Sequence, residues 1–133
     1  MDVITQSVLI SLVLVLVLLN GFFVASEFAI VKVRGTRIQE LVQSGSRSAR
    51  RAQGLIKNMD EYLSATQLGI TLASLALGWV GEPAFAALFE PIFSDLGAAQ
   101  PVLTHSLAAT SAFLLITFLH IVLGELAPKS VAI

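Results

Sequence analysis

The hexapeptide Gly124-Glu125-Leu126-Ala127-Pro128-Lys129 combines a carboxylate with a proline near the end of a long apolar segment. Pro128 has no backbone N–H and its ring conflicts with the carbonyl of residue 124, so we expect that carbonyl to leave the helix ladder. Gly124 tolerates the resulting distortion best. Freed carbonyls in broken membrane helices recur as cation sites. The alternative is a plain helix end at which Glu125 pairs with Lys129, and the local sequence leaves both interpretations open.

Two earlier segments carry polar side chains at helical spacing. One stripe repeats at intervals of three and four residues and comprises Ser64, Gln67, Thr71, Ser74 and Gly78. Before it, Asn20 and Glu27 share a helix face, with Ser26 beside them. Ionisable groups at membrane depth are costly, so Glu27 is a functional candidate. Hydroxyls alone often serve only as packing contacts between helices, which is the alternative for both stripes.

A third polar face ends at the first residue of the hexapeptide and comprises Thr110, Thr117, His120 and Gly124. A lone histidine in a membrane helix is usually a hydrogen-bonded packing residue, and a titrating group is the alternative. Together the three faces offer hydroxyl, amide, carbonyl and carboxylate oxygens, and the chain has no cysteine. This donor set suits hard cations such as Mg²⁺, Ca²⁺ or Na⁺, and does not suit zinc or copper.

Most of these polar residues lie in long runs without charged residues, which we predict to form the helices that position them. Each is long enough for the ~20 residues that cross a hydrocarbon core of ~30 Å. All but one of the eight Lys and Arg residues lie between Lys32 and Lys57, which marks the cytoplasmic side. We therefore predict an all-α membrane protein with an N-terminus outside. The expected spans are residues 3–31, 60–81 and 101–127.

The connections between the spans differ in charge. We expect the basic segment 32–58 to be cytoplasmic and to form short amphipathic helices on the membrane surface, with a solvated connector as the alternative. The sequence Gly81-Glu82-Pro83 predicts a helix break. The acidic segment 82–100 should then form an external loop, with at most a short helix over residues 84–89. No zinc-protease, aspartyl or serine-hydrolase pattern occurs, so we do not expect an enzyme. We also expect no nucleic-acid partner.

Three motifs occur in a familiar order and spacing. They are Asn20-Gly-Phe-Phe-Val-Ala-Ser-Glu-Phe-Ala29, Thr66-Gln-Leu-Gly-Ile-Thr-Leu-Ala-Ser74 and Gly124-Glu-Leu-Ala-Pro-Lys129. Over essentially the whole chain they resemble the transmembrane domain of the CorC/CNNM family of magnesium transporters. The resemblance implies three membrane helices, a cytoplasmic juxtamembrane belt and a homodimer. It also implies cytoplasmic regulatory domains that are absent from this chain, through which alone a nucleotide would bind.

The resemblance also implies a set of site residues. The metal-ligand candidates are Ser26, Thr71, Ser74, Gly124 (through its carbonyl) and Glu125. A surrounding ion pathway would include Asn20, Glu27, Gln67 and Lys129. Many relatives carry a serine where this chain has Val24, so the ligand from the first span stays open between Asn20 and Ser26.

The function implied by the resemblance is Mg²⁺ transport across a bacterial inner membrane. Export coupled to Na⁺ would run through an oxygen-lined site between the helices, with the lipid bilayer as the surrounding partner. The alternative is a dimeric, non-transporting anchor or sensor for cytoplasmic regulatory domains. In that case the polar stripes are packing contacts and Glu125 is an interfacial charge.

Overall fold

The computed structural model describes residues 2–95 and 100–133 and contains helices throughout, with no strand among these residues. Its elements are α1 (Val3–Lys32), α2 (Gly35–Gln43), α3 (Arg47–Lys57), α4 (Met59–Asp95), α5 (Pro101–Leu119), the π-helix η1 (His120–Leu126) and α6 (Ala127–Ala132). Three stretches are long and apolar enough to cross a membrane: Val3–Lys32, Met59–Asp95 and Pro101–Ala132. The predicted all-α fold with three spans is therefore confirmed.

Helix α4 is longer than predicted, and the helix break expected at Gly81-Glu82-Pro83 is wrong. The helix continues through Pro83 and Pro91 to Asp95. Membrane helices tolerate proline where neighbouring helices hold the local backbone in place. Around Pro83 that support is close, because Ala84 is fully buried and Gly81 packs against Ile116 of α5. Most of the expected loop 82–100 is thus helix, and residues 96–99 lie outside the described part.

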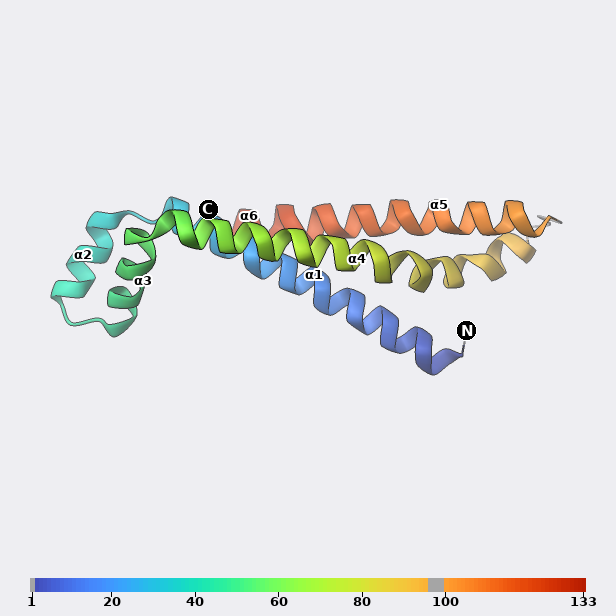
Figure 1. The fold of residues 1–133 in the computed structure, drawn as a ribbon, viewed down its shortest axis with the longest axis horizontal. Coiled ribbons are helices and arrows are strands. Elements are labelled where there is room, and N and C mark those ends of the chain that lie inside the picture. The colour runs from blue at the N-terminus through green and yellow to red at the C-terminus, as the bar shows by residue number, and fades with distance from the viewer. Residues whose placement is uncertain (1, 96–99) are drawn as a thin grey trace.

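Small residues set how closely the three spans approach. Helices α4 and α5 run side by side, and α1 crosses them before diverging toward the N-terminus (Figure 1). One buried cluster joins all three spans through Val13, Val17, Leu77, Ala84 and Ile116. A second cluster joins α4 to α5 and consists of Ala86, Ala108 and Ala112. Alanines at the contact let the two backbones approach closely, which is the usual basis of helix association in lipid.

The basic segment forms two short helices, α2 and α3. They lie across the end of the bundle, roughly perpendicular to the spans (Figure 1). Gly45 makes the turn between them with φ +91°, a conformation that favours glycine. Ser46 then caps α3, because its Oγ accepts a hydrogen bond of 3.2 Å from the Ala49 N–H. The helical form of this segment agrees with the amphipathic interpretation of the sequence.

The π-helix η1 occupies the place where the sequence predicted a disturbed ladder. At its end the N–H of Ala127 bonds to the carbonyl of Val122, five residues back. A π-turn inserts one extra residue per turn, and such turns often mark functional sites. The ring of Pro128 then packs against Gly21 of α1, where an added Cβ would lie 2.9 Å from Pro128 Cγ and 3.4 Å from the Leu123 carbonyl oxygen. A glycine is therefore needed for α1 to approach this turn.

We predict that Gly21→Ala lowers stability by about 1–3 kcal/mol, because the proline ring is held by its own helix and cannot move aside. Gly78→Ala is the matched control, since an added Cβ there meets no atom within 4 Å. The control should be neutral or slightly stabilising, as alanine favours a helix over glycine by up to about 1 kcal/mol. Thermal unfolding in detergent measures both variants. Equal midpoints would show that η1 can move away from α1 without cost.

Candidate functional site

The carbonyl of Gly124 finds no N–H four residues on, at Pro128, and it is bound by a side chain from another span. It accepts a buried hydrogen bond of 2.9 Å from Asn20 Nδ2 of α1. Gly124 is itself buried, and an added Cβ would lie 3.0 Å from both Asn20 Nδ2 and His120 Cδ2. The absence of a side chain at Gly124 makes room for the amide that binds this carbonyl.

This hydrogen bond fixes the orientation of the Asn20 amide and, through it, the proton on His120. The amide nitrogen can only donate, and its second N–H points to His120 Nε2 at 3.2 Å. Nε2 is therefore the acceptor, so a neutral His120 carries its proton on Nδ1. Turning the amide over would place two oxygens against each other at Gly124. Asn20 is almost fully buried, with 1% of its surface exposed.

Ser74 extends the same network to α4. Its Oγ lies 3.3 Å from Asn20 Oδ1, to which it donates, and 3.2 Å from His120 Nε2. The hydroxyl has one proton to share between these two acceptors. One hydrogen-bond network consequently joins α1, α4 and η1, with a residue from each span. Such a network is stronger evidence for a built site than hydroxyls that bond only to their own helix.

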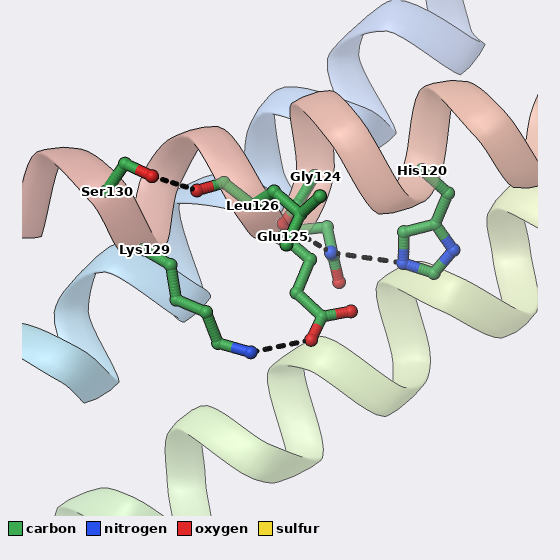
Figure 2. A network of polar contacts seen from close by, with 7 residues as sticks. His120, Gly124, Glu125, Leu126, Lys129 and Ser130 are labelled. Atoms are coloured by element: carbon green, nitrogen blue, oxygen red, sulfur yellow. Dashed lines mark hydrogen bonds and ion pairs between the residues drawn. The ribbon is translucent and has the colours of Figure 1, made fainter.

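Glu125 and Lys129 form an ion pair beside this network. Figure 2 shows the two side chains reaching toward each other from η1 and α6, and Nζ lies 2.7 Å from Glu125 Oε1. The ammonium also lies 5.0 Å from the centroid of the Phe28 ring of α1, within the range of a cation–π contact. The pairing expected for a simple helix end is therefore present, and it lies beside the Gly124 carbonyl that accepts the hydrogen bond from Asn20.

The network and the ion pair border one cavity of about 260 Å³. Its lining residues come from all three spans and are Asn20, Val24, Glu27, Phe28, Ile70, Ser74, His120, Glu125 and Lys129. Two carboxylates and one ammonium line it, so its formal charge is −1 when all three are ionised. The Glu27 carboxylate makes no hydrogen bond or ion pair with any described residue. The cavity thus holds an acidic group that Lys129 does not neutralise.

A second cavity of about 170 Å³ shares Ser74 and His120 with the first. It lies between α4 and α5 and is also lined by Gly78, Thr117 and Glu82. The two cavities therefore meet at the Ser74 and His120 side chains. Glu82, which the sequence placed in a loop, lies on α4 at the border of this second cavity.

The structure brings together part of the predicted residue set. Asn20, Glu27, Ser74, Glu125 and Lys129 line the larger cavity, and Gly124 adjoins it through Asn20. The other three predicted residues, Ser26, Thr71 and Gln67, are not among its lining residues.

The hydroxyls of Ser26 and Thr71 bond to their own helix instead. Ser26 Oγ donates to the Phe22 carbonyl at 2.7 Å, and Thr71 Oγ1 donates to the Gln67 carbonyl at 2.9 Å. Gln67 and Thr71 are exposed on α4. Of the polar stripe on α4, Ser74 and Gly78 therefore border the two cavities, whereas Gln67 and Thr71 do not. The adjacent apolar face, with Ala73 and Leu77, packs against the other spans.

His120 is the residue whose importance the sequence did not reveal. Its position on a polar face with Gly124 was visible, but a lone histidine gives no sign that two spans converge on its Nε2. It adds one nitrogen to a donor set that was expected to be all oxygen. Among the described residues no group of three or more His, Cys, Asp or Glu side chains could hold a metal ion, so any cation here would depend on amide, hydroxyl, carbonyl and water oxygens as well.

Comparison with known proteins gives one consistent result. The family described as the Cyclin M (CNNM) transmembrane N-terminal domain matches residues 11–133. The UPF0053 protein YhdT of Bacillus subtilis (strain 168) is 53% identical over 133 residues, which cover all of this chain and 28% of that protein. The UPF0053 protein YugS of the same organism is 50% identical over 121 residues, or 91% of this chain and 28% of that protein.

A more distant relative shows the same coverage. The UPF0053 protein sll0260 of Synechocystis sp. (strain ATCC 27184 / PCC 6803 / Kazusa) is 39% identical over 124 residues, or 91% of this chain and 27% of that protein. The chain thus spans little more than a quarter of the length of these relatives. Its three apolar helices and the match over nearly its whole length agree. The chain therefore belongs to the CNNM family, as its transmembrane domain.

Proposed function

We propose that this domain carries Mg²⁺ across the membrane through the cavity between its three spans. The observation that supports this most is the convergence of Asn20, Ser74 and Glu125, from three different spans, on one cavity with a net acidic lining. Polar groups at membrane depth are expensive unless they are partnered or functional. A purely structural contact would not need an open volume of about 260 Å³ beside the carboxylates.

The donors of the cavity suit a hard, partly hydrated cation. Mg²⁺ prefers six oxygens, keeps several of its waters and takes one or two carboxylates. A water occupies about 30 Å³ of liquid, so the cavity has room for an ion with part of its hydration shell. Asn20 Oδ1, Ser74 Oγ and the Glu125 carboxylate are the proposed protein ligands. The Gly124 carbonyl would join them if the Asn20 amide turned away from it.

We further propose that Mg²⁺ is exported in a process coupled to Na⁺, which is also a hard cation and is bound by neutral oxygens. The domain would act as a homodimer in a bacterial inner membrane. A dimeric anchor or sensor is the competing function. It would leave Ser26 and Thr71 bonded to their own helices, as they are here, and would use Glu125 only as a partner of Lys129. Ion binding separates the two functions.

The first test of the proposal removes the charge of Glu125. Glu125→Gln keeps the size of the side chain and should weaken Mg²⁺ binding at least about tenfold, because neutral donors compensate poorly for lost water in a low-dielectric site. Glu125→Asp should recover only part of the affinity. Glu61→Gln, on the exposed first turn of α4, is the control. Thermal stabilisation by Mg²⁺ and flux into liposomes are the measurements. Unchanged stabilisation in a folded Glu125→Gln variant would favour the anchor function.

The second test fills the cavity from α4. Ser74→Leu removes the hydroxyl that bridges Asn20 and His120 and places an apolar side chain in the volume, so Mg²⁺ affinity should fall at least about tenfold. Leu75→Ala is the matched control, since Leu75 is 67% exposed on the outer face of the same helix turn. Isothermal titration in detergent compares the two variants. Equal affinities would mean that Ser74 serves packing alone.

The third test addresses orientation. We expect the α2–α3 segment to be cytoplasmic, because positive charge is retained on that side. The chain has no cysteine, so single-cysteine variants are unambiguous. Asp95→Cys should react with an impermeant maleimide in intact cells, and Ser48→Cys should react only after permeabilisation. Both positions are exposed. Labelling of Ser48→Cys in intact cells would reverse the proposed orientation.

A further inference from the structure

We propose that Lys129 is a built-in counter-cation that competes with the transported divalent cation for the Glu125 carboxylate. This inference rests on the proposed function. Its geometric basis is that the ammonium lies 2.7 Å from Glu125 Oε1 while both side chains line the cavity. The Glu125 carboxylate would bind a divalent cation through the same oxygens that now bind the Lys129 ammonium. Binding of the cation therefore requires Lys129 to release Glu125.

The position of Lys129 is suited to such an exchange. It is the one Lys or Arg residue outside the segment from Lys32 to Lys57. A glutamate four residues before a lysine is the favourable order for a helical pair, so the ammonium returns readily to Glu125. The Phe28 ring supports the ammonium on another side at 5.0 Å. The lysine side chain is a compact charge on a flexible four-carbon stem, which allows it to move without a change in the backbone.

Charge explains why this exchange favours a divalent cation. With Lys129 on Glu125, the cavity has one unpaired carboxylate, Glu27. A divalent cation entering that arrangement would meet the ammonium at close range, whereas displacing the ammonium leaves two carboxylates facing two positive charges. A monovalent cation brings no more charge than Lys129 and competes with a group that is covalently tethered nearby. Lys129 thus raises the cation concentration that is needed to occupy the Glu125 carboxylate, and it selects against monovalent ions.

The decisive experiment neutralises the lysine. Lys129→Gln should tighten apparent Mg²⁺ affinity by roughly tenfold and should lower the ratio of Mg²⁺ to Na⁺ affinity, because the tethered competitor is gone. Lys129→Arg keeps the charge and should not tighten binding. Lys57→Gln, exposed at the end of α3, removes one charge away from the cavity and should leave affinity unchanged. Isothermal titration with Mg²⁺ alone and with Na⁺ alone gives these constants.

The outcomes separate this inference from the function on which it rests. Weaker or unchanged Mg²⁺ binding in a folded Lys129→Gln variant, with normal binding by the wild type, would overturn the role of Lys129 alone. A weaker variant would make Lys129 a residue that positions Glu125. Absence of Mg²⁺ binding in the wild type would overturn both proposals.

A second measurement uses the wild-type chain and does not depend on folding of a variant. Reductive ¹³C-methylation labels its lysines, which are Lys32, Lys57 and Lys129. Titration with Mg²⁺ should move the Lys129 signal toward that of exposed Lys57, with the same midpoint as binding. The signals of Lys32 and Lys57 serve as internal references. A Lys129 signal that stays in place while Mg²⁺ binds would show that the ion pair persists.

Discussion

The proline at position 128 is the constraint on which the site depends. A helix that lacks one N–H must leave a carbonyl without its usual partner, and at membrane depth such a carbonyl needs another donor. The structure meets this need by widening the helix into η1 and by placing Asn20 of α1 on the Gly124 carbonyl. The Asn20 amide has two N–H donors. With one of them on the Gly124 carbonyl, the other points to His120 Nε2, and the amide oxygen accepts from Ser74. One contact therefore orients the side chains of Asn20, His120 and Ser74.

Close approach of the backbones makes this arrangement possible. Asn20 reaches Gly124 because Gly21, the next residue of α1, leaves space for the ring of Pro128. Farther along the bundle, Gly69 faces the Phe23 ring and Gly81 faces Ile116, each at a distance that an added Cβ would fill. In lipid no hydrophobic force drives helices together, so close packing and interhelical hydrogen bonds must hold them. The polar network and the glycine contacts therefore stabilise the same geometry.

Two carboxylates and one ammonium line the larger of the two cavities that meet at Ser74 and His120, and at membrane depth they would be unfavourable without mutual compensation. Lys129 compensates Glu125, while Glu27 lines the cavity with no ion-pair or hydrogen-bond partner in the part of the chain that the structure describes. This imbalance distinguishes the site from an ordinary buried ion pair, in which each charge is matched. It is also the feature that a cation would correct, which links the proposed transport to the proposed exchange at Lys129.

The sequence alone determined the class of the protein, because uncharged runs of about 20 residues and one basic segment have few other solutions in a bilayer. It also located the opening of the helix at Gly124, since proline acts on its own helix through local geometry. It could not show that α4 continues through Pro83, as that depends on support from neighbouring helices. It could not show that Asn20 and Ser74 line the cavity while Ser26 and Thr71 do not, because the sequence does not say which face of a helix meets another span. His120 gained its role in the same way, through a tertiary contact made by two other helices.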